Sequence, residues 1–167
     1  MTDSLINWFT TNLDGLPKEL IVFIISMVPI LELRGGFVAA ALLKIPYLQA
    51  VPICIIGNII PIPFILLFIK KIFAWMKTRK TFKGMVEKLE TKSLSKADTI
   101  RKYEFLGLLL FVGIPLPGTG AWTGSLIACL LDVKMKKAVP AIFLGLILAT
   151  LIMSFITYVM PYLISLI

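Results

Sequence analysis

Glu32 and Arg34 are the residues of this sequence whose setting most clearly indicates chemistry. They lie two residues apart in the segment VPILELRGG, residues 28–36, inside one of the most apolar parts of the chain. An ionisable group at membrane depth costs from roughly 3 to more than 10 kcal/mol, and such groups usually line a pathway or pair with each other. Glu32 is therefore a candidate proton acceptor or coupling group, and Arg34 a candidate substrate clamp. The alternative is a structural role that only holds the hairpin together, either as a mutual pair or through hydrogen bonds to exposed turn backbone.

Other reactive groups are sparse. Histidine is absent, which removes the commonest metal ligand and the side chain that carries protons near neutral pH. The two cysteines, Cys54 and Cys129, lie in apolar runs without metal-ligand spacing, so we interpret them as free thiols. The serines have no histidine or cysteine partner, and no phosphate loop of the nucleotide-binding type occurs. We therefore expect neither an enzyme nor a metal or cofactor protein.

The composition indicates an integral membrane protein. Hydrophobic residues make up 59% of the 167 residues, and the mean hydropathy is +0.97. The first residues lack the basic, apolar and small-residue order of a cleaved signal, so we expect residue 1 to be retained. Residues 1–16 have the pattern of a helix lying in the membrane interface. Its apolar residues share one helical face: Leu5, Trp8, Phe9, Leu13 and Leu16.

The apolar segments fall into two length classes. Gln49–Ile69 and Ala138–Leu163 have the roughly 20 residues that a membrane-spanning helix needs. Four others are about half that length: 20–31, 36–45, 105–116 and 121–131. The sequences ELRGG and PLPGTG join these short segments in pairs, and their glycines and prolines favour a reversal. Each pair is thus expected to form a re-entrant helical hairpin, with one kinked span as the alternative.

The two halves resemble each other at an offset of 88 residues. This offset superposes the AVP sequences at 50–52 and 138–140, Gly57 on Gly145, and Gly36 on Gly124. A unit of one hairpin plus one span crosses the membrane once, so its copy must be inserted the other way up. The predicted fold is therefore all-α and polytopic, a single membrane domain with an inverted repeat. Its parts are repeat 1 at 20–69, a basic linker at 70–104 and repeat 2 at 105–163.

The basic residues predict the orientation. Of the 17 lysines and arginines, 11 lie at 70–102 and three at 134–137. Basic loops are expected in the cytoplasm, so a multi-pass protein of the cell membrane should have its linker 70–104 inside and both termini outside. The two hairpin turns should then meet near the midplane. The net charge of +8 is explained by this topology and by contact with anionic lipid, so no nucleic acid partner is expected.

The turns have the features of an anion site. Helices starting near Gly35 and Thr119 would point their N-terminal amides toward the midplane, and helix N-termini attract anions. Gly118, Thr119 and Gly120 add backbone donors and a hydroxyl, and Arg34 adds a planar fork suited to phosphate or carboxylate.

For Asn58 and Trp122 the sequence is compatible with two roles each. Asn58 either satisfies a carbonyl freed by the nearby prolines or contacts substrate. Trp122 aligns with Arg34 at the repeat offset and is either a gate or packing.

Three blocks resemble those of a known family. PILELRGG (29–36), GNIIPIPFIL (57–66) and GIPLPGTGAWTGSLIA (113–128) are similar to signatures of the putative small multidrug export protein family, which is grouped with the DedA-like superfamily. The resemblance implies two opposed re-entrant hairpins, and some members of that superfamily resemble proton-dependent flippases of undecaprenyl phosphate. It also implies a set of site residues: Glu32, Arg34, Asn58, Pro117, Gly118, Thr119, Gly120 and Trp122. The arginine motif of the better-studied DedA branch is absent, since no basic residue follows the second turn until Lys134.

The leading functional prediction is a proton-coupled secondary transporter or lipid flippase for an amphiphile with an anionic headgroup, such as a polyprenyl phosphate. Glu32 would couple protons, and Arg34 with the helix N-termini would hold the headgroup. A proton-driven exporter of cationic compounds is the first alternative, and a non-transporting membrane scaffold is the second. The expected partners are membrane lipids, protons and the substrate. We also expect a homodimer, because half-length hairpins need burial that one small subunit does not supply.

Overall fold

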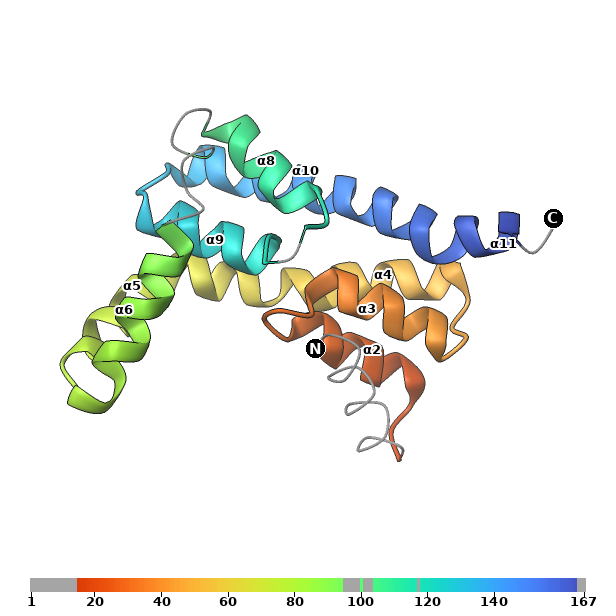
Figure 1. The fold of residues 1–167 in the computed structure, drawn as a ribbon, viewed down its shortest axis with the longest axis horizontal. Helices are drawn as coiled ribbons and strands as arrows, with labels where there is room; N and C mark the ends of the chain where they lie inside the picture. The colour runs from red at the N-terminus through yellow and green to blue at the C-terminus, as the bar shows by residue number, and fades with distance from the viewer. Residues whose placement is uncertain (1–14, 95–99, 101–103, 117, 165–167) are drawn as a thin grey trace.

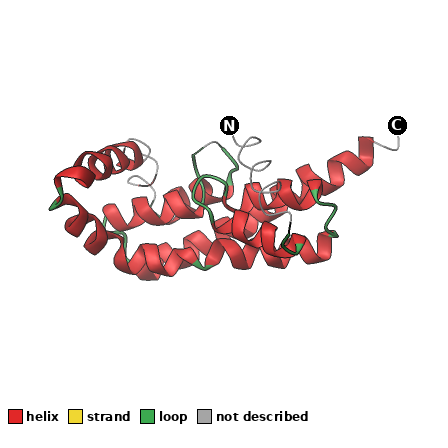
Figure 2. Cartoon of the chain, turned by 90° about the horizontal axis from the view of Figure 1, so that it is seen from below, coloured by secondary structure: helices red, strands yellow, loops and turns green. Residues whose placement is uncertain are grey.

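A computed structural model describes residues 15–94, 100, 104–116 and 118–164 of the chain, and all regular structure in these ranges is helical (Figures 1 and 2). The predicted interfacial helix at 1–16 lies almost wholly outside the described residues. The elements are α2 (Lys18–Met27), α3 (Glu32–Leu42), α4 (Tyr47–Ile59), α5 (Pro61–Lys77), α6 (Lys80–Leu94), α8 (Phe105–Gly113), α9 (Ala121–Leu130), α10 (Met135–Ser154), the π-helix η1 (Phe155–Val159) and α11 (Met160–Ile164).

The long and short helices follow the two length classes of apolar segment. Among the described residues, two stretches are long and apolar enough to cross a membrane: Tyr47–Lys77 and Met135–Ile164. The first contains α4 and α5, with Pro61 at the first position of α5, where its missing N–H leaves no helical hydrogen bond unmade. Helices α2, α3, α8 and α9 have 10, 11, 9 and 10 residues. At 1.5 Å per residue they reach about half of a bilayer core of roughly 30 Å.

The short helices form two hairpins that share the two long helices. α2 and α3 pack against each other and against α4, whereas α8 and α9 pack against α10. The far half of each long stretch crosses to the other hairpin, because α5 packs on α9 and η1 packs on α3. Figure 1 shows the turns of the two hairpins meeting near the middle of the molecule. The core is therefore continuous across both halves.

The first turn differs from the prediction. ELRGG was expected to be the turn, but the chain reverses at residues 28–31 and ELRGG forms the start of α3. The reversal follows Pro29, which cannot continue α2, and Ile30 adopts a left-handed φ of 87°. The glycines serve packing instead: a Cβ on Gly36 would lie 3.0 Å from Cys54 Sγ and would overlap the Ser26 hydroxyl. Close helix contact, rather than a turn, explains this glycine pair.

Left-handed backbone positions recur at the repeat offset. Ile30 and Gly118 have φ of 87° and 74°, and Glu32 and Gly120 have φ of 50° and 133°. Each member of a pair is 88 residues from the other. Residues other than glycine rarely adopt such φ values. Positive φ values at matching positions therefore indicate that the two turns have the same backbone conformation.

The second arm of each hairpin also ends in the same way. Lys44 and Asp132 have φ of 57° and 56° and follow α3 and α9. The next N–H groups donate five residues back, from Ile45 to Ala40 O at 2.9 Å and from Val133 to Ala128 O at 3.0 Å. This is the Schellman arrangement, which satisfies carbonyls at a helix C-terminus. The two halves therefore share local backbone structure as well as sequence.

Candidate functional site

The candidate site is the junction where the two hairpin turns meet, called here the hairpin junction. Glu32, the first residue of α3, sends its carboxylate to the start of α9 in the other hairpin. Ala121 N donates to Glu32 Oε2 at 2.8 Å, and Trp122 N donates to Oε1 at 3.2 Å. The Glu32 residue is only 5% exposed. A carboxylate at a helix N-terminus satisfies amides that lack helical partners and is favoured by the helix dipole.

Arg34 lies two residues after Glu32 in α3. It binds the chain just after α8, the first arm of the second hairpin. Its guanidinium donates to Leu116 O, to Ile114 O at 3.3 Å, and to the Thr119 hydroxyl at 2.8 Å. Thr119 Oγ1 is itself within donating distance of the same two carbonyls, at 3.0 and 2.8 Å. The planar fork of arginine suits such multiple acceptors. Arg34 therefore holds the irregular backbone that follows α8.

Trp122 makes the corresponding contact in the opposite direction. Its indole Nε1 donates to Met27 O, the last residue of α2, at 3.2 Å. Trp122 and Arg34 are 88 residues apart. Each therefore lies near the start of the second arm of its own hairpin and donates to the end of the first arm of the other. The sequence left a gate and packing as the two roles of Trp122. The contact shows that its side chain links the two hairpins.

Asn58 lies beside this junction, near the end of α4. It is fully buried, and its Nδ2 is 3.4 Å from Ser26 O. Its side chain also lies close to the Glu32 carboxylate. Asn58 Oδ1 is buried without a hydrogen-bond partner among the described residues. A buried polar oxygen without a partner is unusual and calls for an explanation.

The remaining predicted site residues are placed less favourably for binding. Gly35 was expected near a free helix start, but its N–H donates to Leu31 O at 2.8 Å within the first turn of α3. Because α3 begins at Glu32 and α9 at Ala121, the two helix starts are shifted from the predicted positions near Gly35 and Thr119. Gly118 lies exposed in the second turn, and Pro117 falls outside the described residues.

The partners of Glu32 and Arg34 are mostly backbone atoms, and sequence reasoning did not find that they belong to the opposite hairpin. The sequence predicted either a mutual ion pair, bonds to exposed turn backbone, or substrate contacts. Within the described structure, no salt bridge joins the two side chains, and each binds the backbone of the opposite hairpin. Helix ends always leave unpaired amides and carbonyls, so the available signal was the pair of helix ends flanking each turn.

The sequence matches a model of one protein family. A sequence model described as "Putative small multi-drug export protein" matches residues 32–152, well over half of the chain. The chain belongs to the putative small multi-drug export protein family. The match begins at Glu32 and includes Arg34, Asn58, Thr119 and Trp122. Neither the curated proteins nor the solved structures that were searched gave a match.

Membership in this export family and the two long apolar helices together identify a membrane protein. Among the described residues, no group of three or more histidine, cysteine, aspartate or glutamate side chains could hold a metal ion. The ionisable groups of the hairpin junction are instead tied to backbone from the opposite hairpin. This arrangement can hold the two hairpins together while Glu32 is ionised, and it weakens if Glu32 gains a proton.

Proposed function

We propose that the protein is a proton-coupled secondary transporter in which the hairpin junction is a latch controlled by Glu32. The ionised carboxylate accepts from Ala121 N and Trp122 N and holds α9 against α3. A proton on Glu32 removes the charge that both amides bind. The hairpins then separate and expose the junction to one side of the membrane. Polytopic insertion as an inverted repeat, with the linker 70–104 in the cytoplasm, is part of the proposal.

The observation that carries the proposal is that Asn58, whose side chain lies close to Glu32, has a buried Oδ1 without a hydrogen-bond partner among the described residues. An ionised carboxylate only accepts hydrogen bonds, so it interacts with the amide NH₂. A protonated carboxyl also donates one, and Asn58 Oδ1 is an acceptor that nothing else in the described structure uses. Asn58 can therefore partner both protonation states. If Asn58 only stabilised the fold, it would need to bind just one protonation state of Glu32.

The strength of the Glu32 latch and the energy that a proton gradient supplies are of comparable size. Hydrogen bonds to a charged group are worth about 1.5–3 kcal/mol each, so the two amide bonds of Glu32 amount to roughly 3–6 kcal/mol. A proton gradient supplies about 1.4 kcal/mol per pH unit, and a charge crossing the full membrane gains about 2.3 kcal/mol per 100 mV. A latch of this strength is thus within reach of the protons that would open it.

For the substrate, we propose an amphiphile with an anionic headgroup, for example a polyprenyl phosphate. The start of α9 already binds one anion, the Glu32 carboxylate. When Glu32 is protonated, the same amides become available to a headgroup, with the Arg34 guanidinium nearby. Substrate and carboxylate would thus exchange at one site. A cationic headgroup would instead have to approach both Arg34 and the positive end of a helix.

Export of cationic compounds is a second candidate, and the family description matches it at the level of multi-drug export. In that case Glu32 would leave the α9 amides to bind the cation. The two candidates predict opposite effects of Glu32→Gln, because glutamine cannot compete as a charge for the amides and cannot pair with a cation. Native mass spectrometry with a polyprenyl phosphate and a quaternary ammonium dye measures both. Stronger phosphate adducts with weaker dye adducts would support the anionic substrate, and the reverse pattern would support the cationic one.

Transport itself is tested in proteoliposomes under an imposed proton gradient. We expect wild type to move substrate, Glu32→Gln to be folded but uncoupled, and Asn58→Leu to be strongly slowed because the protonated state loses its acceptor. Lys88→Gln, on the exposed face of α6, is the control and should be unaffected. A wild-type protein that moves neither substrate under any gradient would leave the membrane scaffold as the explanation. Unfolding of Glu32→Gln would also contradict the latch.

A further inference from the structure

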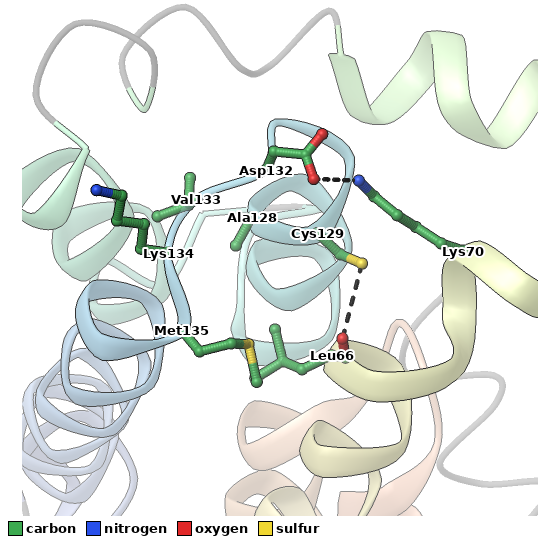
Figure 3. Close-up of a pocket in the computed structure, with 8 residues that line it drawn as sticks. All are labelled: Leu66, Lys70, Ala128, Cys129, Asp132, Val133, Lys134 and Met135. Atoms are coloured by element: carbon green, nitrogen blue, oxygen red, sulfur yellow. Dashed lines mark hydrogen bonds and ion pairs between the residues drawn. The ribbon is translucent and has the colours of Figure 1, made fainter.

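A second site lies at the other end of α9, away from the hairpin junction. A cavity of about 280 Å³ opens between α5, the last turn of α9 and the start of α10 (Figure 3). Leu66, Ala128, Val133 and Met135 give it an apolar lining, and Cys129 also lines it. We call it the Lys70 cavity, after the lysine at its rim. Its residues take no part in the proposed latch.

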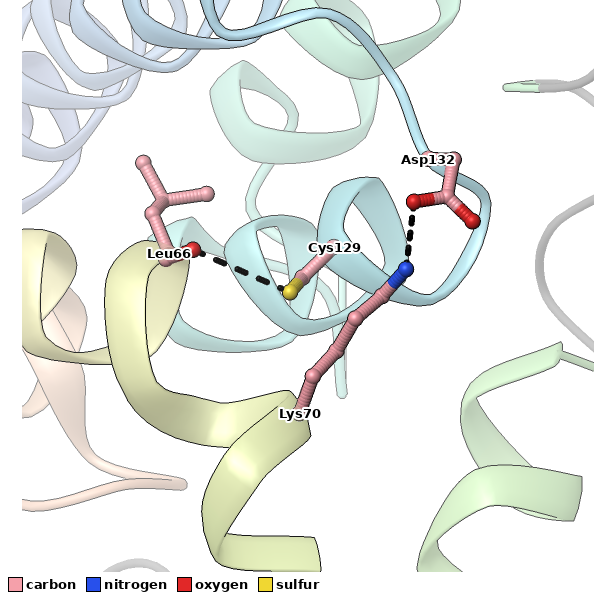
Figure 4. Close-up of polar contacts among 4 residues, drawn as sticks. All are labelled: Leu66, Lys70, Cys129 and Asp132. Atoms are coloured by element: carbon pink, nitrogen blue, oxygen red, sulfur yellow. Dashed lines mark hydrogen bonds and ion pairs between the residues drawn. The ribbon is translucent and has the colours of Figure 1, made fainter. Parts of the chain in front are cut away.

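The rim of the Lys70 cavity is basic. Lys70 pairs with Asp132 across the opening, and Figure 4 shows this contact beside the one from Cys129 Sγ to Leu66 O at 3.8 Å. The side chains of Lys70 and Asp132 are 45% and 82% exposed, and exposed pairs contribute little stability. Lys134 also lines the cavity, with its ammonium group pointing away from Lys70 (Figure 3), and it has no ion-pair partner among the described residues. An anionic group can therefore replace Asp132 at Lys70 at little energetic cost.

The apolar surroundings indicate what kind of anion fits. With a volume of about 280 Å³, the cavity has room for a phosphate group and a few methylene groups, but not for a whole lipid chain. The outer face of α5 continues from it with exposed apolar side chains, among them Leu67 and Phe64, which are 59% and 64% exposed. An acyl chain can lie along this face while the headgroup stays at the lysines. Basic pockets between helices at a membrane surface are suited to anionic lipid headgroups.

We propose that the Lys70 cavity binds the headgroup of an anionic phospholipid, with the phosphate at Lys70, further positive charge from Lys134 at the rim, and the acyl chains along α5. Charge complementarity and the adjoining apolar face both favour a lipid over free phosphate. The bound lipid would cover Cys129. This proposal rests on the membrane setting of the protein and not on transport or on Glu32.

The cysteines of the protein provide the test. Cys129 lines the cavity, whereas Cys54 is fully buried elsewhere and should stay unlabelled as long as the protein is folded. The full-length protein is placed in nanodiscs of phosphatidylglycerol or phosphatidylcholine and treated with N-ethylmaleimide, and labelling of each cysteine is followed by peptide mass spectrometry. We expect phosphatidylglycerol to slow the labelling of Cys129 by about fivefold relative to phosphatidylcholine. Adding glycerol phosphate to the phosphatidylcholine discs should not slow it.

Variants separate a built site from general surface charge. Lys70→Gln with Lys134→Gln should bring the ratio of the two rates close to one, whereas Lys88→Gln, which removes a lysine outside the cavity, should leave it unchanged. Glu32→Gln should also retain the lipid effect, so a failed latch and a failed lipid site are distinguishable. An equal lipid effect in the double variant and in Lys88→Gln, or no lipid effect in wild type, would overturn the proposal. Protection by glycerol phosphate alone would replace the lipid with a soluble phosphate ligand.

Discussion

Glu32 and Gly120 are 88 residues apart and face each other across the hairpin junction. A Cβ on Gly120 would lie 2.8 Å from Glu32 Cδ and 3.0 Å from Oε1. Residues related by a two-fold axis meet only when they lie close to that axis. Their contact is consistent with the proposed inverted repeat, whose axis would then pass through the junction, and the lack of space explains why one half has a carboxylate where the other has no side chain.

The first prediction concerns Gly120→Ala. The new Cβ has no room beside Glu32, and the φ of 133° is strained for alanine. We expect a loss of about 2–4 kcal/mol, or roughly 5–15 °C in apparent melting temperature in detergent. Gly84→Ala in α6 is the matched control, because a Cβ there meets nothing within 4 Å and alanine favours a helix. Equal melting temperatures for the two variants would show that the junction is not packed as described.

The second prediction concerns the three acceptors of Arg34. Lysine has a single ammonium group, which cannot reach Leu116 O, Ile114 O and the Thr119 hydroxyl together. We expect Arg34→Lys to lower stability by about 1–3 kcal/mol although the charge is kept. Arg79→Lys is the control, since the Arg79 side chain lies over the exposed Trp75 ring, at 5.8 Å, where a lysine can also lie. If lysine fully replaces Arg34, its charge alone matters and the geometry of the fork does not.

A third prediction follows from the matching contact of Trp122. Trp122→Phe keeps the aromatic ring but removes the N–H that donates to Met27 O. The expected loss is about 0.5–1.5 kcal/mol, while Trp75→Phe, at a site 58% exposed, should change little. Combining Trp122→Phe with Arg34→Lys tests whether the two contacts act together. Residues of one network usually show coupling of about 0.5–3 kcal/mol, so strictly additive losses would mean that the two contacts are independent.

The sequence predicted the helices better than it predicted their contacts. Apolar length distinguishes a span from a half-span, and the glycines and prolines of PLPGTG indicate a reversal, so most of the element pattern could be derived from residue types. The partners of Glu32 and Arg34 could not be derived in this way. Apart from the Thr119 hydroxyl they are backbone N–H and C=O groups, which nearly every residue has. Gly35 was placed in a turn for a related reason. Glycine serves both tight turns and close helix packing, and composition does not distinguish these uses.

The pH dependence of stability provides a fourth prediction at the start of α8. Lys137 hydrogen-bonds to Glu104 and lowers the pKa of that carboxyl below its usual range. A lowered pKa in the folded state contributes stability above the unfolded pKa, and this stability is lost as the pH falls through the folded value. Glu104→Gln should therefore be less stable than wild type at pH 7 and equal to it at strongly acidic pH. Lys137→Gln should show the same pattern in denaturation at several pH values, and a deficit independent of pH would exclude the ion pair as its cause.

The last prediction concerns the two contacts that join each long helix to the base of the opposite hairpin. Lys70 of α5 binds Asp132 after α9, and Tyr158 of η1 donates to Ile45 O after α3 at 3.1 Å. Lys70 and Tyr158 are again 88 residues apart, so the two contacts lie at equivalent places in the two halves. If transport proceeds by alternating access, opening toward one side separates the first pair and opening toward the other separates the second.

Cysteine pairs at these positions, in a background with Cys54→Ala and Cys129→Ala, test this directly. Joining residues 70 and 132, or residues 45 and 158, with a short bifunctional thiol reagent should stop flux in either case, and a cleavable reagent should restore it on reduction. A pair at Lys83 and Glu87, one helical turn apart within α6, is the control and should not affect flux when joined. Full transport with both functional pairs joined would mean that neither contact opens during the cycle.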